Sequence, residues 1–356
     1  MLNFNFKDKN LKIVQKFWIF LIVSAVIIVA GLVDTFFVRH MNLGVEFEGG
    51  VSIDVNVSGV AVESGKIEEE VISWLKGGNE KKDVFEVDGT VQKSGVGLKT
   101  LTFRISSSKK DANGKVVNLN VEGADNKLEI VHTSDYIKDS ENGLPAHLRE
   151  VFGEKAVIDV ETQVISESQA NVTVRRAFIA VGVAVAVILV YIALRFNLLA
   201  GVSAIVALIH DVLIMVAFTT IFQLPVNMTF IAAIITIVGY SINATIVVFD
   251  RIRELHVLPS NIEKTDVEIA NEAITGTLSR SILTTLTTLV MIVILAIFGS
   301  TAIRDFALPI IFGLLAGAYS SVLLSAPLWV KLRKLFKQEN KKPVKKIKKI
   351  KEQAKA

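Results

Sequence analysis

The chain has 356 residues, of which 51% are hydrophobic and 21% are charged, and its mean hydropathy is +0.50. This composition excludes a disordered chain, which needs low hydropathy and high net charge, and it argues against a single water-soluble domain. The chain has no cysteine, so disulfides, thiol catalysis and cysteine-ligated metals are excluded.

The net charge of +4 is divided unevenly along the chain. Residues 331–356 carry 12 Lys and Arg against two Glu, whereas residues 41–174 carry 23 Asp and Glu against 14 Lys and Arg. The basic excess therefore belongs to the C-terminal tail, and we expect no nucleic-acid partner.

Six segments are long and apolar enough to cross a membrane as helices, which takes about 20 residues each. They cover residues 17–38, 174–194, 200–222, 228–249, 282–298 and 306–330. The first stands alone, and the other five follow one another with short connections. The sequence therefore predicts a polytopic α-helical membrane protein in a 1+5 arrangement, with a separate domain at residues 39–173.

Basic residues in the flanking segments predict the orientation, because Lys and Arg are enriched in cytoplasmic loops. They occur before the first span, after the second and fourth spans, and in the tail: Lys7, Lys9, Lys12, Lys16, Arg195, Arg251, Arg253, Lys264 and the lysines beyond residue 330. With six spans, all of these lie on one side. We expect residues 1–16 and 331–356 in the cytoplasm and residues 39–173 outside. No small-x-small cleavage site follows the first span, so we expect it to be retained as an anchor.

The segment at residues 39–173 has the pattern of an α+β domain. Apolar alternation at 51–57 and 157–164 predicts strands, residues 84–105 predict a hairpin, and helical spacing occurs at 63–76 and 145–152. The order β-α-β-β-α-β is typical of a ferredoxin-like fold. Residues 106–126 are polar and predict a loop or a small turn-bearing insertion, and residues 128–131 a short extra strand. No catalytic pattern emerges from this domain.

Several polar residues interrupt the predicted spans, where charges are costly and are candidates for function. They are Asp211 near the middle of the third span, Ser241, Asn243 and Thr245 in the fourth, Asp250 at its inner end, and Arg280, which begins the fifth. We interpret them as a candidate pathway for protons or ions. The alternatives are interhelical hydrogen bonds and, for Asp250, an ion-pair cluster at the membrane surface.

Two further patterns concern packing and lipid. Gly313, Gly317 and Ser321 recur every four residues in the sixth span and predict a face on which helices approach closely. The lysine-rich tail predicts attraction to anionic lipid at the cytoplasmic surface.

Several motifs resemble those of the SecF family of protein-export membrane proteins, within the resistance-nodulation-division (RND) superfamily. Residues 43–50 resemble the motif L-G-[IV]-[DE]-F-x-G-G after its first span, with Gly44, Phe47, Gly49 and Gly50 at the defining positions. Further similar motifs in spans three to six lie at residues 207–212, 239–243, 247–254, 277–281 and 317–321. The resemblance covers nearly the whole chain, except that the outer domain matches only at its ends. It implies half of a twelve-span RND-type bundle.

The resemblance implies an accessory subunit of the Sec protein translocase in the cytoplasmic membrane of a prokaryote. Such a subunit pairs with SecD, acts beside SecYEG, and uses an ion gradient to promote late steps in the export of unfolded preproteins. We find no H-E-x-x-H or G-x-S-x-G motif and expect no enzyme, cofactor or metal site. The alternatives are a subunit of an RND-type exporter of small molecules or lipids, and a scaffold of the translocase without transport of its own.

One position departs from the family pattern. Many SecF sequences have Asp, implicated in the proton pathway, where this chain has Ala244. Alanine carries no proton. Either the relay relies on Asp211, Arg280 and a partner chain, or another ion is used, or this half is only supportive.

Overall fold

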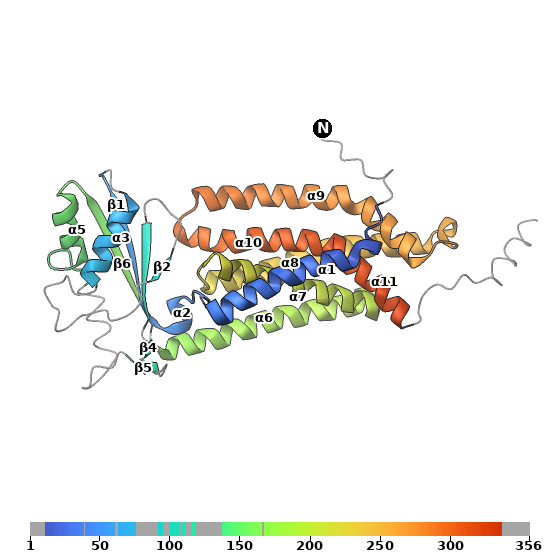
Figure 1. Cartoon of the computed structure of the whole chain (residues 1–356), viewed down its shortest axis with the longest axis horizontal. Coiled ribbons are helices and arrows are strands. Elements are labelled where there is room, and N and C mark those ends of the chain that lie inside the picture. Colours follow the sequence, from blue (N-terminus) through green and yellow to red (C-terminus); the bar gives the residue numbers. More distant parts are fainter. Residues whose placement is uncertain are drawn as a thin grey trace, which may run out of the picture.

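The computed structural model describes residues 11–38, 40–60, 63–75, 92–94, 100–106, 108–110, 116–118, 137–165 and 167–336. In these ranges a bundle of long helices carries a small α+β domain at one end (Figure 1). Six helices are long and apolar enough to cross a membrane. The prediction of a polytopic helical membrane protein is thus confirmed.

The membrane helices agree with the predicted spans in number and order among the described residues. They are α1 (Phe17–Val33, extended by a π-helical turn, Asp34–Val38), α6 (Glu167–Arg195), α7 (Leu198–Ile221), α8 (Met228–Val257), α9 (Asp266–Phe298), and α10 (Thr301–Ser320) with α11 (Ala326–Leu335). A second π-helical turn, Ser321–Ser325, joins α10 to α11, so both belong to the sixth span.

Helix α9 differs from its prediction, because it begins at Asp266 rather than near Arg280. Residues 266–281 mix polar and apolar side chains, so a hydropathy threshold misses them. They are helical because Thr265 and Glu268 form a capping box, in which each side chain accepts a hydrogen bond from the other's backbone N–H. Arg280, which is predicted to begin the fifth span, lies 14 residues after Asp266, the first residue of the helix.

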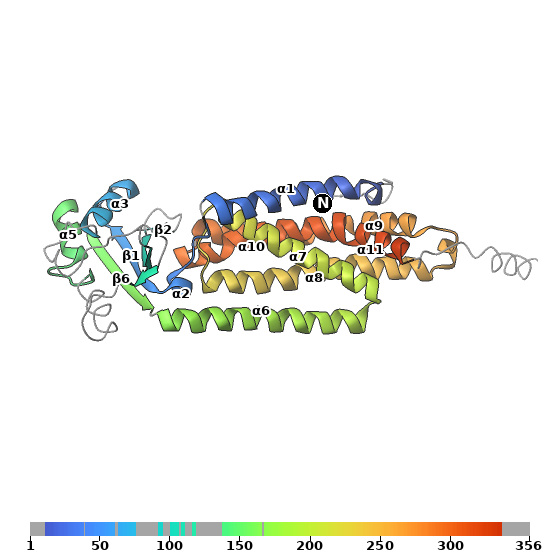
Figure 2. The ribbon, with the colours of Figure 1, turned by 60° about the horizontal axis from the view of Figure 1, so that its bottom comes forward.

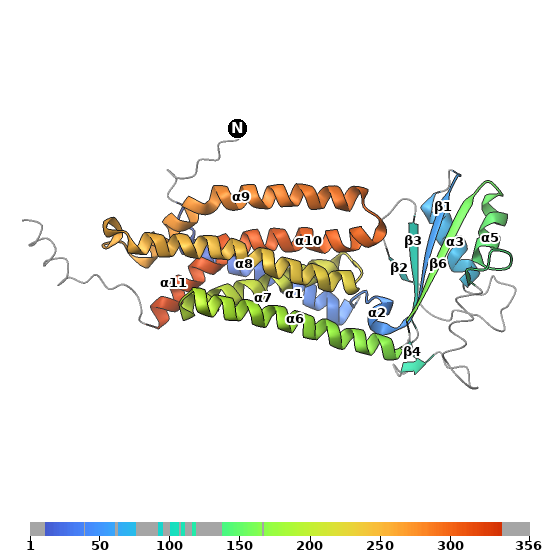
Figure 3. The same ribbon diagram turned by 180° about the vertical axis from the view of Figure 1, so that it is seen from behind.

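Helices α7, α8 and α10 form the centre of the bundle. In α7 and in α10 with α11 most side chains of the apolar segment are buried, whereas those of α1, α6 and α9 are mostly exposed. Figure 2 shows α1 and α6 at opposite sides of the bundle, and α8 packs against both α10 and α6 (Figure 3). The outer helices therefore present broad apolar surfaces to lipid or to another chain.

Two glycines allow the closest helix contacts. A Cβ added to Gly31 in α1 would overlap the Cβ and Cα atoms of Ala217 in α7. A Cβ on Gly313 in α10 would lie 2.5 Å from Cγ1 of Ile237 in α8. In both places the absence of a side chain sets the distance between the helices.

The α+β domain is built on a four-stranded antiparallel sheet of order β2-β3-β1-β6. The strands are β1 (Gly50–Ser58), β2 (Gln92–Ser94), β3 (Thr100–Ser106) and β6 (Val157–Ile165). Helices α3 (Ser64–Ser73) and α5 (Leu144–Phe152) cover one face, where Ile53, Val55, Phe103 and Leu148 are buried together. The alternate residues of β1, such as Asp54, lie on the opposite face.

The described elements match four predicted ones: the strands at 51–57 and 157–164 and the helices at 63–76 and 145–152. Of the predicted hairpin at 84–105, β2 and β3 are described and pair antiparallel, whereas residues 84–91 lie outside the described ranges. So do residues 128–131. In the predicted insertion, β4 (Ser108–Lys110) and β5 (Val116–Asn118) pair as a two-stranded sheet. A short helix, α2 (Val45–Glu48), was not predicted.

An ion-pair cluster fixes the end of the bundle opposite the sheet. The carboxylate of Asp266 is 1% exposed and lies 3.2 Å from Nε of Arg333 and 3.5 Å from Nε2 of His256. The Arg333 guanidinium also lies over the ring of Trp329, 5.1 Å from its centroid. These contacts join α8, α9 and α11.

The substitution Arg333→Ala is expected to lower the free energy of unfolding by about 3–5 kcal/mol, because it leaves a buried carboxylate without its guanidinium partner. Thermal unfolding of the purified chain in mild detergent measures this. The control is Lys264→Ala, which removes an exposed ion pair with Glu272 and should cost about 0–1 kcal/mol. Equal effects of the two substitutions would contradict the assigned role of the cluster.

Candidate ion site between three helices

Asp211 lies at the centre of the bundle and is completely buried. One carboxylate oxygen accepts hydrogen bonds from the hydroxyls of Ser241 in α8 and Ser320 in α10, the latter at 2.8 Å. The other lies 2.9 Å from Nδ1 of His210. Three helices thus converge on one carboxylate through short polar side chains.

The site extends toward α1 through an aromatic pair. The ring of His210 stacks on Tyr319 with centroids 6.0 Å apart and an interplanar angle of 17°. The hydroxyl of Tyr319 donates a 2.7 Å hydrogen bond to the carbonyl of Phe20. Nε2 of His210 is buried and makes no hydrogen bond with the described residues. The polar network around Asp211 therefore connects α7, α8 and α10 to the first span.

The close approach of α10 to α8 depends on Gly317. A Cβ at this position would lie 3.2 Å from Cβ of Ser241, which is tighter than most real contacts. The small residue lets Ser241 and Ser320 reach the same carboxylate oxygen. The predicted small-residue face thus borders the polar site.

The electrostatics of Asp211 are unusual. No Lys or Arg among the described residues pairs with it, and its partners are two hydroxyls and an imidazole. A buried carboxylate without a full counter-charge is costly inside a membrane span, which makes Asp211 a candidate for function.

The remaining predicted polar residues make no hydrogen bond or ion pair with Asp211. Thr245 is buried one turn beyond Ser241, and Asn243 is exposed on another face of α8. Asp250 pairs with Arg195 at 2.8 Å, with both side chains 40% exposed. That pair fits the surface ion pair considered as an alternative.

Arg280 lies on an exposed face of α9 and makes no ion pair or hydrogen bond through its side chain with the described residues. The threonines that follow it hydrogen-bond mainly to carbonyls of their own helix. The exception is Thr285, whose hydroxyl accepts a 3.0 Å hydrogen bond from Tyr240 in α8. Arg280 is therefore a cation on a membrane helix, and its side chain faces away from the bundle.

The motif at residues 43–50 joins the first span to the sheet. The N–H of Gly44 donates to the carbonyl of Val226 at 2.7 Å, and the N–H of Val226 donates to the carbonyl of Asn42 at 2.8 Å. Phe47 packs against the bundle core. Gly49 has φ +77°, which favours glycine, and Gly50 begins β1. The motif is thus fastened to the turn between α7 and α8.

Ser320 was not among the predicted site residues, although it lies in the motif at 317–321. Serines beside small residues in a span are usually packing elements, so the sequence alone does not single one out. Within the described ranges there is no group of three or more His, Asp or Glu that could hold a metal ion.

A multi-spanning helical protein with a buried carboxylate and a separate sheet domain has the architecture of a membrane transport component. Two family models match the chain: "Protein export membrane protein SecD/SecF, C-terminal" over residues 146–335 and "SecD/SecF GG Motif" over residues 35–59. The chain belongs to the SecD/SecF family of protein-export membrane proteins. The resemblance inferred from the sequence motifs is thereby confirmed.

Individual relatives agree with the family models. The chain is 32% identical to the protein translocase subunit SecF of Borreliella burgdorferi over 89% of its own length and 95% of that protein. It is 42% identical to SecF of Alicyclobacillus acidocaldarius over 49% of its length and 57% of that protein. These relatives support a multi-pass protein of a prokaryotic cell membrane.

A solved structure has the same fold. The crystal structure of SecDF, a translocon-associated membrane protein from Thermus thermophilus, matches with a TM-score of 0.68 and 24% identity. The match covers 92% of this chain and 39% of that one. The fold of this chain thus corresponds to a part of that longer SecDF chain.

Proposed function

We propose that this chain is an accessory, non-catalytic subunit of the protein translocase that pairs with a SecD chain. The family membership and the relatives named as translocase subunits support the role. Together the two chains would form a twelve-span RND-type bundle. By the same inference the partners are the SecYEG translocon and the unfolded preprotein that emerges from it.

The exposed face of α8 and α9 fits the SecD partner. Along α8 the small or polar residues Ala232, Thr236, Gly239 and Asn243 are exposed in one stripe, and no atom lies within 4 Å of a Cβ built on Gly239. Arg280 on α9 lacks a counter-charge among the described residues. An arginine facing lipid is costly, whereas one facing a carboxylate on a partner helix is stabilised.

Ion coupling is the second part of the proposal, and Asp211 is the observation that carries it. A carboxylate that three helices share can take up and release a proton or cation while the helices shift. Movement of one charge through 100 mV supplies about 2.3 kcal/mol, enough to bias two conformations of the bundle. Ala244 cannot take part, so Asp211 and Arg280 with the partner chain are proposed as the pathway.

The outer domain is proposed to receive the emerging polypeptide on the extracytoplasmic side. Both termini would then lie in the cytoplasm, where the tail meets anionic lipid. The strand order β2-β3-β1-β6 with two helices on one face supports a ferredoxin-like domain with a hairpin insertion at residues 106–126. Such a domain binds through exposed strands and loops rather than through a catalytic centre.

Depletion of the protein, followed by pulse-chase labelling of a secreted precursor, tests the export role. We expect slower conversion of precursor to mature protein, and an uncoupler should slow the replete strain to the same rate. Unchanged kinetics after depletion would reject the export role. A defect that the uncoupler does not reproduce would favour a scaffold without ion coupling.

The substitution Arg280→Gln is expected to reduce co-purification of SecD from mild detergent and to slow export, because it removes the cation that the partner's carboxylate would neutralise. The amount of SecD per chain, measured by quantitative mass spectrometry, checks this. The control is Arg253→Gln, which removes an exposed arginine near the C-terminal end of α8. Equal loss of SecD in both variants would contradict the proposed contact.

A further inference from the structure

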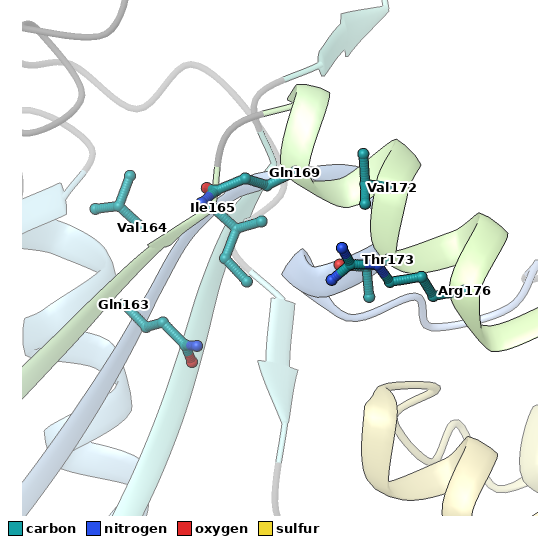
Figure 4. Close-up of a pocket in the computed structure, with 7 residues that line it drawn as sticks. All are labelled: Gln163, Val164, Ile165, Gln169, Val172, Thr173 and Arg176. Atoms are coloured by element: carbon teal, nitrogen blue, oxygen red, sulfur yellow. The ribbon is translucent and has the colours of Figure 1, made fainter. Parts of the chain in front are cut away.

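A cavity of about 520 Å³ lies where the sheet meets the membrane helices. Its described lining comes from the end of β6 (Gln163, Val164 and Ile165) and from the first turns of α6 (Gln169, Val172, Thr173 and Arg176). Figure 4 shows the lining side chains of β6 and of the first turns of α6, with the side chain of Gln169 extending toward Ile165. None of the residues assigned to ion coupling lines it.

The polar groups of the cavity are suited to an anion. The amide of Gln163, the hydroxyl of Thr173 and the guanidinium of Arg176 can donate hydrogen bonds, and no described lining residue is a carboxylate. Arg176 makes no ion pair or hydrogen bond through its side chain with the described residues, so its charge is available to a ligand. An arginine with several donors around it typically binds phosphate or carboxylate.

The position of the cavity restricts the source of that anion. Arg176 lies near the sheet-side end of the apolar segment of α6, Gln169–Ile192, where lipid headgroups are expected. The flank of α6 below the cavity is apolar and exposed: Ile179 is 54% exposed and Val183 58%, and both follow Arg176 on the same face of the helix. A ligand that places an anion beside Arg176 can therefore lay a hydrocarbon chain along α6.

We propose that this cavity binds the phosphate of an anionic phospholipid from the leaflet nearest the sheet. Arg176 contacts the phosphate, and Gln163 and Thr173 contact the rest of the headgroup. The acyl chains lie against Ile179 and Val183. The lipid thereby bridges β6 and α6, the two elements that connect the domain to the second span.

Native mass spectrometry of the full chain in mild detergent, titrated with phosphatidylglycerol, tests this site. The substitution Arg176→Gln is expected to weaken phosphatidylglycerol binding about tenfold, the effect of losing one charge-assisted hydrogen bond. Arg176→Lys, which keeps the charge, should restore part of the affinity. The matched control is Arg175→Gln, because Arg175 is exposed on the same helix and does not line the cavity.

The basic tail is the same in every variant, so its binding of lipid cancels in the comparison. Equal weakening by Arg175→Gln and Arg176→Gln would overturn the proposal, since both would then report only surface charge. Equal binding of phosphatidylcholine would overturn the preference for an anionic lipid. Displacement of the lipid by the same concentration of inorganic phosphate would identify a site for free phosphate instead. The measurement includes no export step, so its outcome is independent of the proposed export function.

Discussion

Replacement of Asp211 by asparagine is expected to abolish the part of export that depends on the membrane potential. Asparagine has nearly the same shape and can keep contacts with Ser241 and Ser320, but it can neither bind a proton nor balance a cation. The bundle should therefore fold and pair normally while the coupling is lost. Pulse-chase export of a secreted precursor, with and without an uncoupler, measures the effect.

The expected result is export at the uncoupled rate in both conditions, with normal abundance of the chain. Asp250→Asn is the control, because its carboxylate pairs with Arg195 at an exposed surface and should be replaced with little effect. Retention of potential-dependent export in Asp211→Asn would remove Asp211 from the coupling pathway. Its hydrogen bonds would then serve only to hold three helices together.

The second large effect is expected at Gly31, where α1 crosses α7. Gly31→Ala places a Cβ on the backbone of Ala217, so the helices must separate, which costs about 1–3 kcal/mol in the free energy of unfolding. Ala217→Gly should restore only part of the stability, because it removes the Cβ that the new methyl meets but leaves the Cα of Ala217 in its way. Thermal unfolding of the four combinations in detergent gives the coupling energy between the two positions.

Gly182→Ala in α6 is the matched control, since no atom lies within 4 Å of the position of its Cβ. That substitution should be neutral or stabilise the helix by up to about 1 kcal/mol. If Gly31→Ala and Gly182→Ala have the same thermal unfolding midpoint, then α1 and α7 are not in close contact at Gly31. If Ala217→Gly restores none of the stability, the clash between the two Cβ atoms is not part of the cost.

The sequence predicted features that depend on local composition. The membrane spans could be predicted because apolar runs of membrane length are rare in other proteins. The strand at 51–57 could be predicted because apolar and polar side chains alternate along it. The true start of α9 was missed because residues 266–281 form a helix with only one apolar face. The capping box at Thr265 and Glu268 would have indicated it.

The site was predicted only in part, because its geometry depends on contacts between distant segments. Asp211 could be identified from its unusual place in a span. Ser320, which is 109 positions further along the chain, could be assigned to it only once the helices were packed. Conversely, Asp250 was a candidate by type, and its contact with Arg195 at the surface could not be read from spacing.

The two connections of the sheet to the bundle are built differently. Residues 42–44 are hydrogen-bonded to Val226, and α2 packs against the start of α6, so this corner is fastened to the bundle. Strand β6 ends at Ile165 and α6 begins at Glu167, while the rest of α6 packs lightly on its neighbours. Residues 42–44 would then stay fixed while α6 tilts. Because β6 leads directly into α6, a small tilt of this one helix would turn the whole sheet above the membrane surface.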